Sequence, residues 1–570
     1  MKKSIYFIVT SLLVLTSCSK KAEIVDNFNW RKATVYFLIT DRFCNGDSTN
    51  DKNYGRINDY GSERINAATF HGGDWVGIYN KAKEGYFTKL GIDVVWLTDP
   101  YEQIHGWMSG SGDVNDFPHY GYHGYYPLDY TQTDKNYGTI EEFRALVNLL
   151  HSQGIRVMLG ANINDPGYPT LLDAVQYKYD STLNVTEADA AKHNSNWQYS
   201  KWTANNAQWT NWWTSEWIRT NDEQWDQNNP YTATLYGLPD YKTEKTSSVK
   251  IPIFLKEKWR NEGNYNDKWV NPSAKKLRQD KEWSPSQYVI AWISSWVEEF
   301  GIDGFRCDIV ENVETFRWKE LKDSCNIALN KWRKKHPEDR AAKWEDDVFF
   351  TGDFDQAYID YKPIYAKSGF NCMVNFKFPK DGNLDSIKNV WQTYSDSLQA
   401  HKDWQSFSYL NNAYFRDANP NNMINCATTF LLSPGAVQIF YGDEINRKLS
   451  DARFNVDAAQ AFRSDYNWQE TDSVLFKHYC KLGQIRLRHP AIGMGKQTKL
   501  SENTYLRTYD ADKIIISIIN NNHGIVDTEN VFPESSKIRN EYTGEISIVK
   551  NHKVAFSNIQ NEILILSIND

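Results

Sequence analysis

The chain has 570 residues, which is too long for one compact core, so we expect two or three domains. Its net charge of −8 argues against a nucleic-acid-binding protein, because such proteins carry a basic domain or stripe. A mean hydropathy of −0.65 excludes a protein built from many membrane spans. Aromatic residues make up 15% of the chain. Trp and Tyr rings suit flat, amphipathic ligands such as sugars, although a large aromatic core explains the same count.

Residues 1–18 resemble the signal peptide of a bacterial lipoprotein. Lys2 and Lys3 precede an apolar run over Ile5–Leu15, which is too short to span a membrane and suits the core of a signal peptide. The run leads into a lipobox-like stretch that ends at Cys18. An ordinary secretory signal with an incidental Cys is the alternative. We expect lipidation of Cys18, and a mature chain that is exported and anchored, in the periplasm or at the cell surface, by that lipid alone.

Past the signal, eight short apolar runs alternate with amphipathic stretches such as 139–153 and 286–300. This alternation indicates βα units and a parallel sheet of the α/β class. Eight such strands over about 420 residues fit a (β/α)8 TIM barrel with insertions. The predicted strands are Val35–Leu38, Val94–Leu97, Val157–Leu159, Gly304–Arg306, Val348–Phe350, Met373–Phe376, Phe407–Leu410 and Val437–Phe440.

The barrel pattern is interrupted once and stops before the chain does. After the third predicted strand, residues 168–283 are rich in Asn, Trp and Thr, with seven Trp over Trp197–Trp225, and predict an inserted domain. The barrel would then comprise residues 30–167 and 284–497. Residues 498–570 contain β-rich runs separated by polar turns and predict a C-terminal β-sandwich.

Arg306 and Asp308 stand at the end of the fourth predicted strand, where barrel enzymes carry their chemistry. They are two residues apart on an extended chain, so their side chains face the same side. A carboxylate beside an Arg stays ionised and can act as a nucleophile. For an isolated pair of this kind, a structural ion pair would be the simpler explanation.

Further motifs accompany this pair. Gly304–Asp308 matches the nucleophile strand of the alpha-amylase family, glycoside hydrolase family thirteen, which the chain resembles over residues 30–570. The resemblance implies a barrel, an inserted domain after strand three and a C-terminal β domain. It also implies retaining hydrolysis of α-glucosidic bonds. The other matching stretches are Tyr122–Tyr125 with Asp129, Leu238–Asp240 and Pro434–Glu444, and bacterial members share Ile104–Trp107, Arg463–Trp468 and Arg488–Gly493.

The resemblance supplies only part of the family's catalytic set. It implies that Asp308 is the nucleophile with Arg306 beside it, and it puts Asp353 where the family has its acid, a Glu. Asp is one methylene shorter, and a misplacement on the order of 1 Å can cost 10²-fold in rate. The family's third carboxylate follows strand seven in a His-Asp pair, and residues 411–416 contain no such pair. We therefore expect impaired catalysis.

Other positions of the family pattern also differ. On the third strand Gly160 replaces an Asp and Asp165 replaces a His, and after the nucleophile Glu311-Asn312 replaces a Lys-His pair. A replacement acid could come from Glu311, Asp355 or Asp165. Solvated loop charges are the simpler interpretation of these three side chains.

A polar loop over residues 45–51 predicts a calcium site. It carries four amide or carboxylate side chains in seven residues, and Ca²⁺ takes six to eight oxygen ligands from such loops. A polar turn is the alternative. The family resemblance adds a segment that closes this site and a second site with a backbone carbonyl at Asn312. The implied ligands are Asn45, Asp47, Asn50, Asp51, Gly72 and Asp74 for the first site, and Asn164 and Asp240 for the second.

The ligand class implied by the resemblance is an α-1,4-glucan: starch, glycogen or maltooligosaccharides. Tyr122 is expected to stack on the sugar with His123 beside it, and Trp107 lies in the loop after strand two as a further contact. Three interpretations stay open. One is an exported hydrolase, and another is a pseudoenzyme that binds α-glucan without cutting it. The third is a scaffold that neither binds nor cuts the glucan.

Overall fold

The structure is a computed structural model that describes residues 28–56, 68–109, 118–167, 170–178, 186, 188, 213–219, 229–232, 239–263, 268–354, 357–449, 458–519 and 524–569. The expected signal peptide with Cys18 lies outside these residues, as do Leu238, Asp355 and most of Trp197–Trp225.

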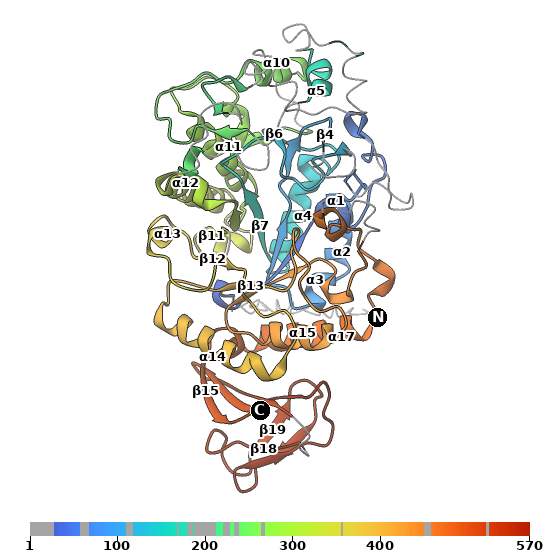
Figure 1. Cartoon of the computed structure of the whole chain (residues 1–570), viewed down its shortest axis with the longest axis vertical. Coiled ribbons are helices and arrows are strands. Elements are labelled where there is room, and N and C mark those ends of the chain that lie inside the picture. Colours follow the sequence, from blue (N-terminus) through green and yellow to red (C-terminus); the bar gives the residue numbers. More distant parts are fainter. Residues whose placement is uncertain are drawn as a thin grey trace, which may run out of the picture.

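Eight parallel strands close into a barrel (Figure 1). The order around the barrel is β1-β14-β13-β12-β11-β10-β7-β2, and β2 pairs with β1 to close it. Each predicted strand coincides with one of the eight, so the predicted TIM barrel is confirmed. The strands are β1 (Thr34–Leu38), β2 (Val94–Leu97), β7 (Arg156–Ala161), β10 (Gly304–Cys307), β11 (Phe349–Gly352), β12 (Cys372–Asn375), β13 (Phe407–Tyr409) and β14 (Ala436–Phe440).

Helices surround the barrel and bury their apolar stripes against it. In α4, for example, a capping box between Thr139 and Glu142 starts the helix, and Phe143, Val147 and Leu150 face inward. The described helices of the barrel are α1 (Thr40–Phe43), α2 (Trp75–Lys83), α3 (Tyr86–Lys89), α4 (Ile140–Ser152), α11 (Pro285–Phe300), α12 (Thr315–Lys335), α13 (Pro363–Lys367), α14 (Leu384–Ala400), α15 (Met423–Leu431), α16 (Ala458–Phe462), α17 (Val474–Arg488) and α18 (Pro490–Met494).

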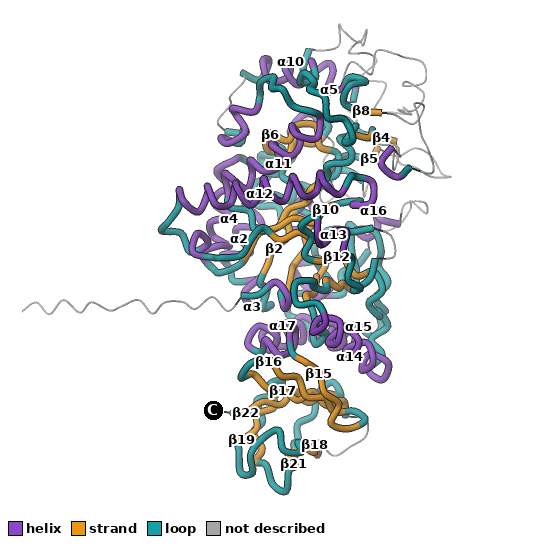
Figure 2. Tube along the Cα trace, turned by 90° about the vertical axis from the view of Figure 1, so that its left-hand side faces the viewer, coloured by secondary structure: helices purple, strands orange, loops and turns teal. Residues whose placement is uncertain are grey.

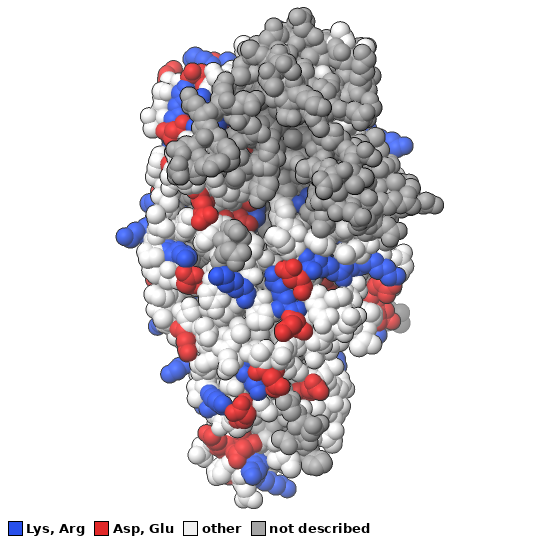
Figure 3. Space-filling model, viewed as in Figure 1, with Lys and Arg blue, Asp and Glu red and all other residues white. Residues whose placement is uncertain are grey.

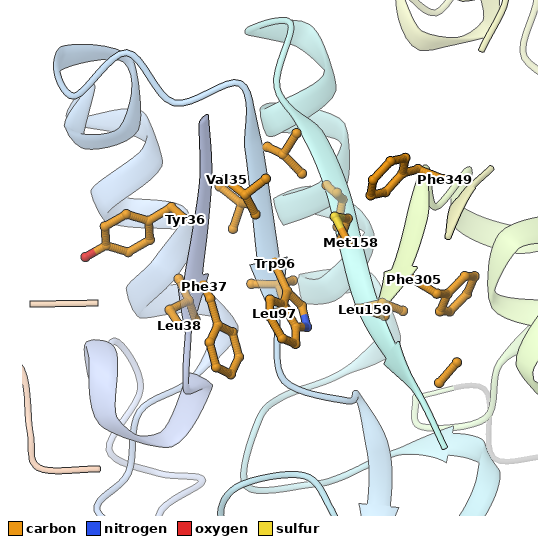
Figure 4. Close-up of a cluster of buried hydrophobic side chains, with 14 of the residues drawn as sticks. Val35, Tyr36, Phe37, Leu38, Trp96, Leu97, Met158, Leu159, Phe305 and Phe349 are labelled. Carbon is orange, nitrogen blue, oxygen red and sulfur yellow. The ribbon is translucent and has the colours of Figure 1, made fainter. Parts of the chain in front are cut away.

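The barrel core consists of large side chains from neighbouring strands (Figure 4). Phe37 of β1 stacks on Trp96 of β2 with ring centroids 3.8 Å apart. Both rings also border the pocket described below, so the packing that closes the barrel shapes that pocket as well.

The region after β7 is described only in part, and what is described is built from short elements. Trp213 and Trp217 are fully buried there, and Trp217 lies 5.9 Å from Trp292 of α11. These two Trp side chains therefore belong to the aromatic core. The elements of this side of the molecule are β3 (Tyr101–Gln103) paired with β6 (Pro127–Thr133), β4 (Met108–Ser109) with β5 (Pro118–His119), β8 (Ile218–Arg219) with β9 (Asp240–Tyr241), and helices α5 (Leu171–Gln176) and α10 (Ile253–Asn261).

The C-terminal strands form an antiparallel sheet at the end of the molecule that carries α14, α15 and α17 (Figure 2). A two-stranded sheet packs on it through a separate apolar core, so the second layer of the predicted sandwich is short. His489, after α17, bonds Asp512 at 3.0 Å and lies 3.7 Å from Glu541, which links barrel and sheet. The strands are β15 (Lys496–Ser501), β16 (Thr504–Tyr509), β17 (Asp512–Ile518), β22 (Ile563–Ile568), β19 (Lys537–Asn540) and β20 (Ile546–Ile548), and the pair β18 (Ile525–Asp527) and β21 (Lys553–Ala555).

Figure 3 shows Lys and Arg interspersed with Asp and Glu on the face drawn, without one continuous basic surface. In the described part of the chain, no helix has the length and apolar character needed to cross a membrane.

Candidate functional site

A narrow pocket of about 10 Å³ opens where the barrel strands end. The strand ends bring these side chains together because parallel strands of a barrel all finish at one face. Its lining combines three aromatic rings with two carboxyl groups and one guanidinium. The lining residues are Phe37, Trp96, Thr98, Asp99, Tyr125, Gly160, Ala161, Asn162, Arg306 and Asp308.

Arg306 joins the two carboxyl groups that the sequence assigned to the chemistry. Its Nη1 lies 2.7 Å from Asp308 Oδ1, and its Nη2 donates to Asp353 Oδ2. The arrangement follows from the register of β10 beside β11, in which Cys307 is paired with Gly352 and each carboxyl residue comes next. The structure thus brings Arg306, Asp308 and Asp353 together.

Asp353 is held tightly within this group. Its Oδ1 accepts a hydrogen bond from the Ile309 backbone N–H at 3.2 Å, and its other oxygen accepts from Arg306. Burial raises the pKa of Asp353 to about 6, against the lowering effect of Arg306 and with a further raising effect of Asp308. Ile309 has a φ of 49°, a strained conformation for a β-branched residue, of the kind that clusters at functional sites.

The segment after β13 contributes no carboxylate to the pocket. Asn411 donates to Asp443 at 2.7 Å, and Asn412 accepts from the backbone of Tyr414 at 2.8 Å to form a turn. The next carboxyl group along the chain, Asp417, is half exposed and pairs with Lys380. Among the described residues that follow β13, none with a carboxyl group lines this pocket.

The three alternative acids differ in position. Asp165 is buried and accepts hydrogen bonds from Asn162 and Asn164, both at 2.9 Å. The Glu311 side chain is exposed, and Asp355 lies outside the described residues. Neither Asp165 nor Glu311 is among the residues that line the pocket.

The Tyr122 ring, to which the resemblance assigns sugar stacking, is not among the residues that line the pocket. Tyr122 is fully buried, and the guanidinium of Arg42 lies over its ring at 3.7 Å, so that face is covered. Tyr125, three residues later, borders the pocket instead. Its ring lies 5.1 Å from that of His123 and 6.1 Å from that of Tyr414.

His123 and Trp107 are both buried. Burial, then the nearby Arg463, His119 and Arg42, lower the pKa of His123 well below its usual value, so its imidazole is neutral. Its Nδ1 accepts from the backbone of Tyr125 at 3.0 Å, which leaves Nε2–H as a buried donor without a partner among the described residues. Trp107 is 9% exposed and does not line the pocket.

Part of the first predicted calcium set gathers around Gly72. A Cβ added there would lie 2.5 Å from Asp51 Oδ1 and 2.6 Å from Asn45 Nδ2. Asn50 is buried, and both its side-chain polar atoms lack a partner within the described ranges. Asp47 points elsewhere and accepts from Thr49 at 2.7 Å. Asp74 caps α2 by accepting from the Gly77 backbone at 2.6 Å and also accepts from the Asp47 backbone at 2.7 Å.

The second predicted set also has unsatisfied oxygens. The Tyr241 backbone donates to the Asn164 carbonyl at 2.7 Å, which places Asp240 beside Asn164. Oδ1 of Asn164 and Oδ1 of Asp240 are buried without a partner in the described structure. Burial raises the pKa of Asp240 to about 8 although Arg219 pairs with its other oxygen. Orphaned oxygens of this kind fit a hard cation. The described residues show no group of three His, Cys, Asp or Glu arranged for a metal, so amide and carbonyl oxygens would have to complete either site.

Two residues of the pocket, Tyr125 and Asp99, carry no role in the sequence assignment. A signal for Asp99 was present, because a carboxyl residue two positions after an apolar strand stands at the end of the barrel that carries the pocket. Nothing in the local sequence shows that Tyr125, and not Tyr122, turns toward it.

The comparisons with known proteins agree with the fold and the motifs. Residues 37–474 match the model of the alpha-amylase catalytic domain. The chain is 35% identical over 520 residues to the periplasmic alpha-amylase of Escherichia coli, covering 86% of this chain and 72% of that protein. It is 24% identical to the beta/alpha-amylase of Paenibacillus polymyxa, of which it covers 34%.

Among solved structures, an alpha-amylase from Geobacillus thermoleovorans, solved with acarbose, aligns with a TM-score of 0.60 at 18% identity, covering 95% of this chain and 99% of that one. An Anoxybacillus alpha-amylase aligns with a TM-score of 0.58 at 19% identity over 95% and 99%. These two likenesses support the fold. With the barrel, the Arg306–Asp308 strand and the match over residues 37–474 taken together, the chain belongs to the alpha-amylase family.

Proposed function

We propose that this protein binds α-1,4-glucans, such as starch, glycogen or maltooligosaccharides, in the pocket at Asp308, and that it hydrolyses them slowly or not at all. The observation that carries the proposal is the Arg306 guanidinium, which bridges Asp308 and Asp353. Tyr125 supports the ligand class, because its ring borders the same pocket and aromatic faces suit sugars.

The bridge supports slow hydrolysis. A retaining glycosidase needs a free nucleophile and a protonated acid about 5–5.5 Å apart. Both oxygens of Asp353 accept hydrogen bonds from the protein, so neither is directed at the oxygen of a leaving group. The missing carboxylate after β13 would act mainly in the transition state, and interactions of that kind determine the rate.

Retaining hydrolysis is the second candidate. The pKa of Asp353, which burial raises to about 6, favours it, because a general acid works best with a pKa near the working pH. In that case Asp308 would attack the anomeric carbon, Arg306 would keep Asp308 ionised, and Asp353 would protonate the leaving oxygen.

We also propose Ca²⁺ as a structural cofactor. Asn45, Asn50 and Asp51 would hold one ion, and Asn164 and Asp240 would contribute to a second. A bound ion would supply positive charge that stabilises these oxygens. In the second set the residues would then join the end of β7 to β9 of the inserted region.

Export by a lipoprotein signal remains part of the proposal. It rests on residues 1–18 and is consistent with the periplasmic location in the name of the Escherichia coli relative.

A reducing-end assay on soluble starch, run on the purified protein and on Asp308→Ala, tests the proposal together with retention in a starch-containing native gel. The expected result is retention of the parent protein, with sugar release that is slow or equal to that of the variant. Fast release by the parent alone would establish the hydrolase. Loss of retention for the parent would refute glucan binding.

A further inference from the structure

Asp99 fills the space that residue 160 leaves empty. β2 and β7 are neighbours in the barrel, with Trp96 paired to Met158, so the residues that follow Trp96 lie against the end of β7. A Cβ built on Gly160 would stand 3.0 Å from Asp99 Cγ and 3.1 Å from its Oδ2, and closer still to Oδ1. Gly160 does not have a positive φ, so glycine is needed here for space and not for backbone conformation.

The pocket wall beside residue 160 keeps a carboxyl group although residue 160 itself is a glycine. The family strand that residues 160–165 resemble begins with Asp, where this chain has Gly160. The carboxyl of Asp99 enters the same volume from the neighbouring strand. The pocket wall therefore has a carboxyl group at this point although β7 does not supply one.

The loop that carries Tyr125 packs directly on Asp99. A Cβ on Gly124, whose φ is 88°, would lie 2.9 Å from the Asp99 backbone nitrogen. Asp99 and Tyr125 thus line the same pocket as the Arg306–Asp308 ion pair. A sugar unit against the Tyr125 ring would have its hydroxyl groups within reach of this wall.

Asp99 is suited to a hydrogen bond with a hydroxyl group. It is 4% exposed, and burial raises its pKa to about 7, with the Gly160 backbone N–H and Arg306 opposing the rise and Asp308 adding to it. Near neutral pH the carboxyl can therefore donate as well as accept.

We propose that Asp99 is a ligand-binding residue of the pocket, delivered from β2 into the volume left open at Gly160, and that it hydrogen-bonds a hydroxyl group of the sugar unit beside Tyr125. The assignment rests on the proposed function, because it takes an α-glucan as the ligand.

Calorimetric titration with maltoheptaose tests the contact. Asp99→Ala should weaken binding about tenfold, the size expected for one hydrogen bond to a buried polar group. Asp93→Asn is the matched control: Asp93 is also buried and stands at the other end of β2, where it accepts from the Thr34 backbone at 2.9 Å. The control should lower the melting temperature and leave the dissociation constant within about twofold.

An exchange of positions tests the shared volume. Gly160→Asp alone should lower the melting temperature, because its side chain would overlap Asp99 and add a like charge. The double variant Asp99→Gly with Gly160→Asp should recover both the melting temperature and the affinity.

Three results would count against the assignment. Affinity of Asp99→Ala within twofold of the parent would refute the contact while leaving the proposed function intact. A double variant no more stable than Gly160→Asp would refute the shared volume. A parent protein that binds no maltoheptaose would refute the proposed function, and the assignment with it.

Discussion

Removing the Arg306 guanidinium should destabilise the barrel, since one buried cation neutralises two carboxylates. Arg306 is 6% exposed, and its two terminal nitrogens bond Asp308 and Asp353. Breaking a buried pair by deleting one partner costs about 3–5 kcal/mol. Unfolding entropy scales at about 2.1 cal/mol/K per residue, so a cooperative barrel of roughly 470 residues shifts about 1 °C per kcal/mol. Arg306→Ala should therefore melt about 3–5 °C lower near neutral pH.

The loss should depend on pH with a defined sign. Arg306 lowers the pKa of Asp353 against burial, so the variant has a still higher Asp353 pKa than the value of about 6 in the parent. A carboxyl whose folded-state pKa is raised contributes stability below its unfolded-state pKa of about 3.9, and that contribution disappears as the pH rises through the folded-state pKa. The melting difference between parent and variant should therefore be smaller at pH 5 than at pH 7.5.

Scanning calorimetry at the two pH values measures both effects. Adding Asp353→Asn to Arg306→Ala removes one of the two uncompensated charges and should recover part of the loss at pH 7.5. Arg306→Lys keeps the charge but cannot bond both carboxylates through a planar fork, so it should fall between parent and Ala. An equal loss at pH 5 and pH 7.5, or no recovery in the double variant, would refute the bridging role.

Three further predictions test other parts of the molecule. Tyr125→Ala should weaken maltoheptaose binding in calorimetric titration with little change in melting temperature, whereas Tyr122→Ala should mainly lower the melting temperature, because the Tyr122 ring packs under Arg42. EDTA should lower the melting temperature if Ca²⁺ is bound, and Asp240→Asn should reduce that effect; the same melting curve with and without EDTA would argue against the cofactor. Burial opposes the charge of His489, but the carboxylates of Asp512 and Glu541 raise its pKa to about 9. The stability that this ion pair contributes is therefore complete below about pH 6.5 and declines as the pH rises through 9. A flatter pH dependence in His489→Gln would support this, and an unchanged one would contradict it.

The barrel could be predicted because its strands are buried on both faces. Such strands appear in the sequence as continuous apolar runs, and Val35–Leu38 and Val94–Leu97 are of this kind. The polar turns of the C-terminal region likewise predict its antiparallel sheet. The size of its second layer was not predictable, since it depends on which strands pair with which.

The chemistry at the site was predictable only where two adjacent strands carry it. Arg306 and Asp353 meet because β10 and β11 are neighbours in the order of the chain as well as in the barrel. Tyr122 and Tyr125 are equivalent in a local motif, and the turn at Gly124 between them, with its φ of 88°, sends only Tyr125 to the pocket. The loop conformation decides this, and local sequence does not encode it.

This pocket has lost fewer carboxyl groups than the sequence of each separate strand indicates. Position 160 counts as a missing carboxylate on β7, yet Asp99 places a carboxyl in the same volume from β2. The loss after β13 is of another kind, because Asn411 and Asn412 are committed to bonds with the protein and Tyr414 brings a ring beside Tyr125. One change moves a polar group without removing it, and the other exchanges a transition-state contact for an aromatic surface. Under the proposed function, the first change leaves a carboxyl group available to the sugar and the second removes a group that would act in the transition state, which favours binding over turnover.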